Sequence, residues 1–335
     1  MRVEEFDFDL PQELIAKKPV YPRDSCRLMV VSRKDSSIKH AVFNQLPEFL
    51  NRGDILVFND TKVIPARFFA TKPTGGRAEV LLTDFIKDGV WHALVGGKGI
   101  KEGLSLRVAQ DFSILIKKHL EGPKFEVEII SKKAFFEAIE LYGRLPLPPY
   151  IQREEEPSDK EDYQSIFAKV PGSVAAPTAS LHFSESLLDA LLERDIKTAF
   201  VTLHISYGTF KPVKVKEVKD HRVDEEFVIV PEETSRLLKN TKAQGGRIIA
   251  VGTTVARALE TAGFESFIGR TGLYIYPGYK FRVVDALITN FHLPRSSLLF
   301  LVSAFGGKEL IMRAYEIAIK ERYRFYSFGD AMLIL

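Results

Sequence analysis

The sequence predicts a three-layer α/β main domain that is interrupted by an inserted small β-barrel domain. Strand-like and helix-like patterns alternate in residues 1–60 and again in residues 154–335, which is typical of α/β proteins. Residues 61–153 instead contain six short strand candidates, separated at close spacing by Gly, Asp or Pro, and this pattern favours a small barrel or sandwich. We therefore expect a discontinuous α/β domain, 1–60 and 154–335, with a barrel of 61–153 inserted between its halves.

Apolar runs and turn residues place the elements in the first half of the chain. Two strands are predicted in the first α/β segment, over residues 27–33 and 54–60. Ser131 is expected to cap a helix over residues 131–143, and a stiff proline-rich stretch, 144–151, follows it. The six strand candidates of the insert are 66–72, 78–85, 90–97, 104–109, 112–118 and 125–130.

The α/β alternation returns in the second half of the chain. Ser184 is the expected cap of one helix, and glycine ends another over residues 231–246. The helix expected over residues 308–323 has one apolar face, which the core of one domain can absorb, so we expect a monomer. The other elements are helix 184–195, strands 197–205, 285–290 and 331–335, and a strand–turn–helix unit over 247–263.

Composition and cysteine usage predict a cytoplasmic protein. Of 335 residues, 45% are hydrophobic and 27% are charged, which is ordinary for a globular chain. The single cysteine, Cys26, excludes an intrachain disulfide and indicates a reducing compartment. The first residues lack the apolar run of a signal peptide, and no apolar run approaches the roughly 20 residues of a membrane-spanning helix. We expect no contact with a membrane.

Charge gives weak evidence for a polyanionic partner. The net charge of the chain is only +3, but residues 61–153 hold 15 Lys and Arg against 10 Asp and Glu, a net charge of +5. Lys214 and Lys216 alternate with valine on an expected strand, so they would share one face. A phosphate backbone would suit both features. A solvated surface explains the barrel charge about as well, and a solvated strand face is the better interpretation of the two lysines taken alone.

A polar bend follows the strand predicted over residues 285–290. The sequence "TNFHLPRSS" places Thr289, Asn290 and His292 before Pro294, just ahead of an apolar helix. A single histidine on an apolar background is more often a satisfied core residue than a catalyst. Here an amide, an imidazole and a cation crowd one turn and are costly to bury without partners, so we favour a substrate pocket.

Two further turns have the composition of ligand-binding loops. Gly252, Thr253 and Thr254 join a buried strand to a helix, and Arg257 lies one turn further on. The N–H groups of that helix terminus and the two hydroxyls suit a carboxylate, ribose or phosphate, although simple capping is the alternative. The small-residue stretch 171–183 would let a planar ligand lie against its backbone, unless it is a plain linker. Its candidate binding residues are Ser173, Ala175, Thr178 and Ser180.

Other candidate binding residues lie near the domain junction and after strand 197–205. Strand ends bind ligands in α/β proteins, but a junction also needs structural capping. Tyr207 and Phe210 flank Gly208 and would stack on a base, cover a cation or belong to the core. The seven histidines are scattered, so no metal site is predicted. The junction candidates are Asn59, Asp60, Lys62 and Arg67.

Several long motifs resemble one known family over almost the whole chain. The motifs are, in this order, "NDTKVIPAR", "YGRLPLPPYI", "YQSIFAKVPGSVAAPTASLHF", "HISYGTFKPV", "GGRIIAVGTTVARALE", "PGYKFRVVDALITNFHLPRSSLLFLVSAF" and "GDAML". By these motifs the sequence resembles the S-adenosylmethionine:tRNA ribosyltransferase-isomerase family of queuosine biosynthesis. The resemblance implies transfer and isomerisation of the ribosyl group of S-adenosylmethionine onto 7-aminomethyl-7-deazaguanine at the tRNA wobble position. Epoxyqueuosine would form in the tRNA, adenine and methionine would leave, and no further cofactor is expected.

The resemblance also directs the assignment of roles. The sulfonium of S-adenosylmethionine acidifies the neighbouring C5′ hydrogens, so a base is needed. Asn290, or the backbone of residues 173–180, would assist departure of adenine, and Tyr207 or Phe210 would face the sulfonium. Thr253, Thr254 and Arg257 suit the methionine carboxylate. The candidate bases are His204, His292, Glu226 and Asp285.

One segment departs from the family pattern. Members often have His-x-Met-His-x-Glu after the "GTF-P" motif, and here "HRVDEE" keeps His221 and Glu226 but has Val223 and Asp224. A catalytic role for a second histidine there is therefore in doubt. The expected macromolecular partner is a tRNA anticodon stem-loop with a flipped base. The competing hypotheses are an S-adenosylmethionine-dependent RNA methyltransferase and a non-catalytic RNA-binding module.

Overall fold

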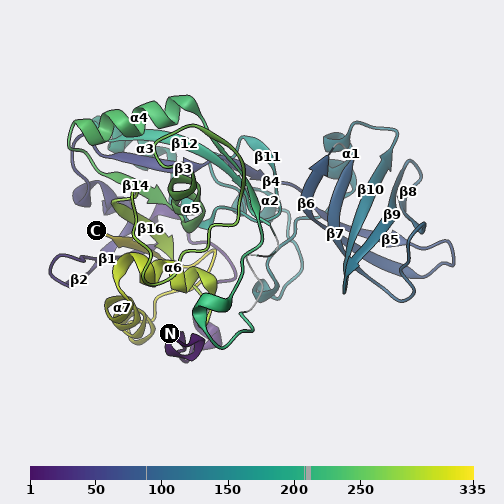
Figure 1. The fold of residues 1–335 in the computed structure, drawn as a ribbon, viewed down its shortest axis with the longest axis horizontal. Helices are drawn as coiled ribbons and strands as arrows, with labels where there is room; N and C mark the ends of the chain where they lie inside the picture. The colour runs from purple at the N-terminus through teal and green to yellow at the C-terminus, as the bar shows by residue number, and fades with distance from the viewer. Residues whose placement is uncertain (88, 207, 209–212) are drawn as a thin grey trace.

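The chain folds into an α/β body and a closed β-barrel, as the sequence predicts (Figure 1). A computed structural model describes residues 1–87, 89–206, 208 and 213–335. The barrel strands all lie inside the predicted insert, 61–153, whose boundaries remain a prediction. No helix of the described residues combines the length and the apolar character that crossing a membrane requires.

A nine-stranded mixed sheet is the centre of the α/β body. Its order is β15-β13-β12-β3-β14-β16-β17-β1-β2. The four central strands β12, β3, β14 and β16 run parallel, so their carboxyl ends meet at one edge. The strands are β15 (Phe267–Thr271), β13 (Glu226–Val230), β12 (Lys197–His204), β3 (Ile55–Asn59), β14 (Ile248–Val251), β16 (Ala286–Asn290), β17 (Ala331–Ile334), β1 (Arg27–Val31) and β2 (Ile38–Val42).

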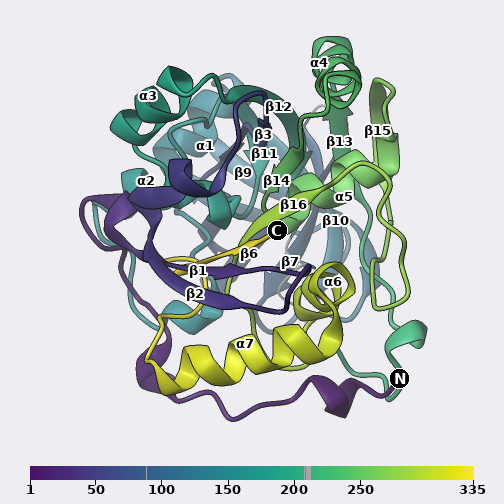
Figure 2. The ribbon, with the colours of Figure 1, turned by 90° about the vertical axis from the view of Figure 1, so that its left-hand side faces the viewer.

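Both faces of this sheet are covered, which makes three layers (Figure 2). Side chains alternate along β3, so Val57 packs into one core and Phe58 into the other. The Val57 face packs against α4 (Glu232–Ala243), α5 (Thr253–Ala262), α6 (Ser297–Gly306) and α7 (Lys308–Lys320). The Phe58 face packs against α3 (Glu185–Glu193) and the 3₁₀ helix η4 (Phe43–Phe49).

The barrel is closed in the order β10-β7-β6-β5-β8-β9 around its own aromatic and aliphatic core. Helix α1 (Phe135–Tyr142) follows its last strand, and a two-stranded parallel sheet of β4 (Thr61–Val63) and β11 (Val170–Ser173) lies at the junction of the two bodies. The barrel strands are β5 (Arg67–Thr71), β6 (Arg77–Lys87), β7 (Val90–Gly96), β8 (Ser105–Ala109), β9 (Phe112–Glu121) and β10 (Lys124–Ser131).

Short helices connect the longer elements. They include α2 (Asp159–Asp162), η1 (Val3–Phe6), η2 (Gln12–Leu14), η3 (Arg23–Ser25), η5 (Pro149–Ile151), η6 (Thr178–His182) and η8 (Val218–Asp220).

Three local predictions can be compared with the structure. Ser184 caps α3, because its Oγ accepts a hydrogen bond from the N–H of Leu187 at 3.1 Å. The prediction that Ser131 caps α1 is wrong: that helix starts at Phe135, and Ser131 ends β10 and accepts from the N–H of Lys133 at 3.0 Å instead. The segment 213–216 is not a strand, although Lys214 and Lys216 are both exposed and alternate with half-buried valines.

Candidate active site

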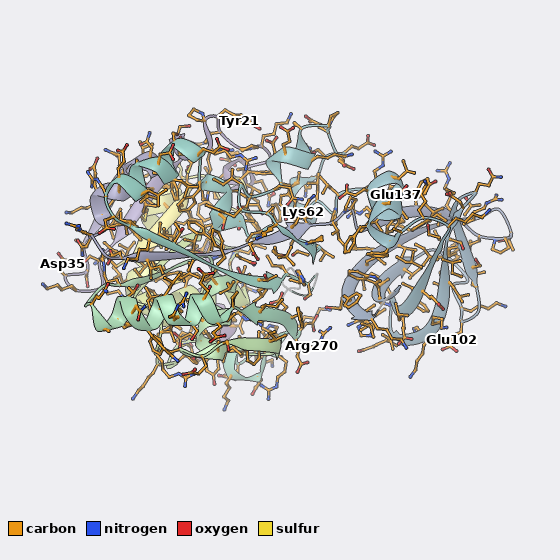
Figure 3. All side chains as sticks on the ribbon, turned by 90° about the horizontal axis from the view of Figure 1, so that it is seen from above. Tyr21, Asp35, Lys62, Glu102, Glu137 and Arg270 are labelled. Atoms are coloured by element: carbon orange, nitrogen blue, oxygen red, sulfur yellow. The ribbon has the colours of Figure 1, made fainter. Side chains whose placement is uncertain are left out.

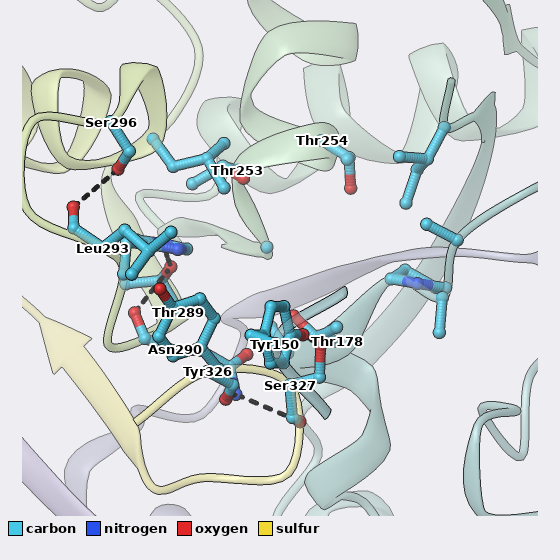
Figure 4. A pocket seen from close by; sticks show the side chains of 18 of the residues that line it. Tyr150, Thr178, Thr253, Thr254, Thr289, Asn290, Leu293, Ser296, Tyr326 and Ser327 are labelled. Carbon is cyan, nitrogen blue, oxygen red and sulfur yellow. Dashed lines mark hydrogen bonds between the residues drawn. The ribbon is translucent and has the colours of Figure 1, made fainter. Parts of the chain in front are cut away.

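One cavity of about 480 Å³ brings the three predicted segments together (Figure 4). It lies where β14 and β16 end, at the edge of an α/β sheet where ligands usually bind. The polar bend, the glycine–threonine turn and the small-residue loop each contribute to its wall, and we call it the His292 cavity. The predicted site residues that line it are Ala175, Thr178, Thr253, Thr254, Thr289, Asn290 and His292.

The amino terminus of α5 forms one wall of the His292 cavity. Gly252 precedes the helix with φ of +103°, a conformation that favours glycine, and no side chain caps the helix there. Thr253 and Thr254 follow directly and are nearly buried. The first turn of a helix leaves N–H groups without intrahelical partners and carries a partial positive charge, so this wall favours an anionic group.

The opposite wall is the bend between β16 and α6. His292 Nε2 and Thr289 Oγ1 lie 2.8 Å apart. The backbone N–H of His292 donates to the Tyr315 hydroxyl at 2.9 Å. Ser296 caps α6 by accepting from the N–H of Leu299 at 3.2 Å. Arg295 also lines the cavity, with φ of +55° and an ion pair to Asp7 at the surface. The imidazole is therefore held by Thr289 of β16, and its backbone by Tyr315 of α7.

His292 is neutral at physiological pH. Burial lowers the pKa of this imidazole to about 3. Thr289 Oγ1 lies 3.4 Å from the Asn290 carbonyl and 2.8 Å from His292 Nε2, so it can donate to the carbonyl while it accepts the proton of Nε2. That tautomer leaves the Nδ1 lone pair available, because Nδ1 has no hydrogen bond within the described residues. The geometry gives a neutral imidazole with an open acceptor in a cavity wall.

Asn290 is fixed by residues from two other parts of the fold. Its Nδ2 donates to the Tyr326 carbonyl at 2.9 Å and to His182 Nε2 at 3.0 Å, and His182 Nδ1 lies 3.2 Å from the sulfur of Cys26. Asn290 Oδ1 is buried and has no hydrogen-bond partner in the part of the chain that the structure describes. A buried acceptor without a donor is costly, so a ligand that supplies an N–H or O–H would bind favourably there.

Two tyrosines that we did not predict complete the His292 cavity. Tyr150 follows the barrel and Tyr326 precedes β17, yet their ring centroids are 4.1 Å apart. The Tyr150 hydroxyl is hydrogen-bonded to Ser327, and burial raises the pKa of both phenols. Figure 4 shows Tyr150, Tyr326 and Ser327 across the cavity from Thr253. The only sequence signal was the position of Tyr150 in the motif "YGRLPLPPYI".

His204 lies in a different cavity. Its Nδ1 is 2.8 Å from Thr61 Oγ1, its ring stacks on Phe227, and burial lowers its pKa to about 4. It lines a space between the α/β body and the barrel, whereas the adjacent Ile205 lines both this space and the His292 cavity. The two candidate imidazoles therefore face separate chambers.

The two carboxylates predicted as bases are engaged in structural contacts away from the His292 cavity. Glu226 forms a buried ion pair with Arg257 and accepts from the N–H of Ser206 at 3.0 Å, and Arg257 Nε donates to the Leu273 carbonyl at 3.0 Å. Asp285 lies at the amino end of β16, where it accepts from Lys242 at 2.5 Å and from the N–H of Ile248 at 2.8 Å. None of these three residues lies in the predicted pocket. Glu226 and Arg257 are held by their ion pair, and Asp285 lies at the opposite end of β16 because of the direction of that strand.

The predicted residues near the junction also make structural contacts. Asn59 ties β3 to β12 through the Leu203 backbone, and Asp60 accepts from Thr202 at 2.6 Å. Lys62 is exposed on β4, and Arg67 on β5 forms an ion pair with Glu79 at 3.3 Å.

The remaining predicted site residues have mixed outcomes. Ser173 Oγ accepts from the N–H of Ile205 at 2.9 Å and is a structural support of the loop. Ser180 is buried outside the cavity wall. Tyr207 and Phe210 lie outside the described residues. Asp224, at the departure from the family pattern, lies beside Arg257 and Glu226 in a small surface depression.

The buried histidines predict a loss of stability in acid. Burial lowers the pKa of His182 to about 4 and that of His292 to about 3, whereas an unfolded histidine titrates near 6.5. As the pH falls from 6.5 toward 4, the unfolded chain binds protons that the folded chain does not. The free energy of unfolding should fall by up to ~1.4 kcal/mol per pH unit for each histidine.

Urea denaturation at pH 7 and pH 5 measures this effect. The variant His292→Gln removes one of the histidines whose pKa burial lowers, so its stability should depend less steeply on pH than that of the unmodified chain. Equal pH dependence in the two proteins would contradict neutral burial of His292.

Cavities at this edge of the sheet hold the ligands of α/β enzymes. The fold and the site therefore place this chain in the class of α/β enzymes. A family model described as queuosine biosynthesis protein matches residues 3–334, so the chain belongs to that family. A curated S-adenosylmethionine:tRNA ribosyltransferase-isomerase of Aquifex aeolicus is 62% identical over 335 residues, and one of Hydrogenobaculum is 52% identical over 344, with 100% of both chains covered each time. The crystal structure of S-adenosylmethionine tRNA ribosyltransferase from Thermotoga maritima matches with a TM-score of 0.58 and 39% identity, covering 99% of this chain and 100% of that chain.

Proposed function

We propose that the His292 cavity binds S-adenosylmethionine as a consumed co-substrate. The chain then transfers and isomerises the ribosyl group onto 7-aminomethyl-7-deazaguanine at the wobble position of tRNA, and releases adenine and methionine. The observation that carries this proposal is that the polar bend, the α5 terminus and the alanine-containing loop line one cavity, in a chain 62% identical to a ribosyltransferase-isomerase. No further cofactor is needed by this proposal.

The lining of the cavity matches the parts of S-adenosylmethionine. The 6-amino group of adenine supplies the donor that the buried Asn290 Oδ1 lacks. Tyr150 and Tyr326 offer ring faces for a planar base or for the sulfonium cation. The carboxylate of the methionine part suits the α5 terminus with Thr253 and Thr254, since Arg257 is already paired with Glu226.

His292 is the residue that we propose as the base for the C5′ hydrogen. It is neutral, it has an open Nδ1, and it lines the same cavity as the proposed adenine contact. His204 lies in the neighbouring cavity and is better placed to act on the other substrate. Glu226 and Asp285 are engaged by Arg257 and Lys242, so we do not assign them this role.

Product analysis tests the proposed function directly. The purified chain is incubated with S-adenosylmethionine and tRNA that carries 7-aminomethyl-7-deazaguanine, and small molecules are identified by mass spectrometry. Stoichiometric adenine and methionine support the proposal. S-adenosylhomocysteine would identify a methyltransferase instead, and tRNA binding without consumption of S-adenosylmethionine would identify an RNA-binding module.

We further propose that the chain acts as a monomer in the cytoplasm on the anticodon stem-loop. The exposed Lys214 and Lys216 lie on the segment that follows the loop after β12. Changing both to glutamate should weaken tRNA binding and flatten its salt dependence, because fewer counterions are released. Filter binding at 50 and 200 mM salt measures both effects.

The control for this charge reversal is the pair Lys34→Glu and Lys39→Glu. Both lysines are exposed at the β1–β2 edge, on the far side of the α/β body from the barrel (Figure 1). If the two double variants bind tRNA equally well, Lys214 and Lys216 do not belong to the tRNA footprint.

A further inference from the structure

A second cavity, of about 640 Å³, lies between the barrel and the α/β body, apart from the His292 cavity that we assign to S-adenosylmethionine. We call it the interdomain cavity. Barrel side chains form one wall and the carboxyl end of β12 with β13 and β15 forms the other. Figure 3 shows Arg270 on the side of the α/β body that faces the barrel, and Glu137 marks α1 on the facing side of the barrel. Arg270 donates to the Phe85 carbonyl at 2.9 Å and so bridges the two bodies.

The barrel wall of the interdomain cavity is aromatic and partly open. Trp91 is buried and stacks on Phe135, with centroids 5.5 Å apart and planes 15° apart, and Phe85 packs edge-on against it at 5.3 Å. Phe85 and Phe136 remain 46% and 48% exposed. Nucleobases stack on aromatic rings that are exposed in this way.

The polar groups of this cavity offer both a donor and acceptors. Trp91 Nε1–H is buried and has no acceptor within the described residues. The Asp84 carboxylate lines the cavity and forms an ion pair with Lys124, with 3.6 Å between Oδ2 and Nζ. His204 presents a neutral imidazole, because burial lowers its pKa to about 4. A ligand with a carbonyl oxygen, N–H donors and a cationic amine would complement this set.

We propose that the interdomain cavity holds the flipped wobble base of the tRNA, 7-aminomethyl-7-deazaguanine, while the His292 cavity holds S-adenosylmethionine; this inference rests on the proposed function. The base is planar, its carbonyl accepts a hydrogen bond, its ring N–H and exocyclic amino group donate, and its aminomethyl group carries a positive charge. Ile205 lines both cavities, so the cavities adjoin at this residue, and the aminomethyl group must reach the ribose there for the transfer to occur. The barrel is thus part of the substrate site and not only an RNA-binding appendage.

The fluorescence of Trp91 reports occupancy of this cavity, because the chain contains a single tryptophan. Anticodon stem-loop RNA that carries the modified base is titrated into the protein without S-adenosylmethionine. We expect saturable quenching. A stem-loop of the same sequence with an abasic wobble position should bind without this quenching, and S-adenosylmethionine alone should leave the emission unchanged. Equal quenching by the two RNAs would overturn the proposal.

A variant pair tests the stacking wall by kinetics. Phe136→Ala removes a half-exposed ring from the cavity, and Leu141→Ala removes a 59% exposed side chain from the same helix, outside the cavity. Phe136→Ala should raise the KM for tRNA about tenfold, given the strength of base stacking on aromatic rings, and leave the KM for S-adenosylmethionine within twofold. Leu141→Ala should change neither.

These results separate the inference from the proposed function. If adenine and methionine are released but Phe136→Ala behaves like Leu141→Ala, the ribosyl transfer stands and the base binds elsewhere. If the unmodified chain releases no adenine, the proposed function itself fails, whatever the fluorescence shows. An equal rise of both KM values would mean that Phe136 supports the fold and would contradict its role as a stacking wall.

Discussion

Replacing His292 by alanine should lower kcat for ribosyl transfer by about 10²–10⁴-fold, the usual contribution of a general base. The imidazole lines the cavity assigned to S-adenosylmethionine, and its Nε2 is held by Thr289 at 2.8 Å. Loss of the ring removes the proton acceptor and leaves the α5 terminus, Asn290 and the tyrosines in place. Binding of S-adenosylmethionine, measured by calorimetry, should therefore change by less than about tenfold, which corresponds to 1.4 kcal/mol.

Two companion variants sharpen this prediction. His292→Gln keeps an N–H for Thr289 but has no basic lone pair, so its kcat should fall as far as that of His292→Ala. His119→Ala changes an exposed imidazole in the barrel and should leave kcat unchanged. Wild-type turnover by both His292 variants would refute the role of this residue.

The pH profile adds a test of the same role. The pKa of His292 is lowered to about 3 by burial, so protonation of this residue cannot reduce the rate above about pH 4. If a loss of activity between pH 7 and pH 5 is seen, another group or the acid unfolding of the chain must cause it. Measuring kcat at pH values where urea denaturation shows a fully folded protein separates these causes.

The site was predictable to the extent that it follows from local strand–turn–helix motifs. A turn after a parallel strand lies at the ligand-binding edge of the sheet, so Gly252 and His292, which follow β14 and β16, had to come close together. The loop with Ala175 was predicted to bind a ligand because its small residues and Pro177 disfavour both a core strand and a regular helix. The fold class was predictable for a similar reason, since the closely spaced barrel strands differ from the α/β alternation around them.

The unpredicted parts depend on contacts between residues far apart in the sequence. Tyr150 and Tyr326 meet only because the exit from the barrel passes the loop before β17. His182 orients Asn290 across 108 positions, and no periodicity reports such a pair. Asp285 could have been excluded from the sequence, because a residue that precedes a strand lies at the end opposite to the one where the next turn begins.

Glu226 shows how the same residue type fits two incompatible interpretations. A carboxylate two positions after the departure from the family motif suggested a base, but the structure places it in a buried pair with Arg257. Its side chain is 1% exposed and that of Arg257 is 10% exposed. A buried ion pair contributes little net stability compared with a well-packed apolar pair, yet the loss of one partner leaves an uncompensated charge. The two interpretations therefore differ most in their consequences for folding.

Glu226→Leu should lower the free energy of unfolding by about 3–5 kcal/mol, since Arg257 would remain buried without its partner. Urea denaturation at pH 7 measures this loss. The double variant Glu226→Leu/Arg257→Leu removes both charges and should recover most of the stability, because the two leucines pack without an unpaired cation. Recovery of the free energy of unfolding is the decisive result. If Glu226 were only a catalytic carboxylate, a second change at Arg257 would not restore stability. If instead Glu226→Leu is as stable as the unmodified chain and inactive, Glu226 acts on a substrate and the structural assignment is wrong.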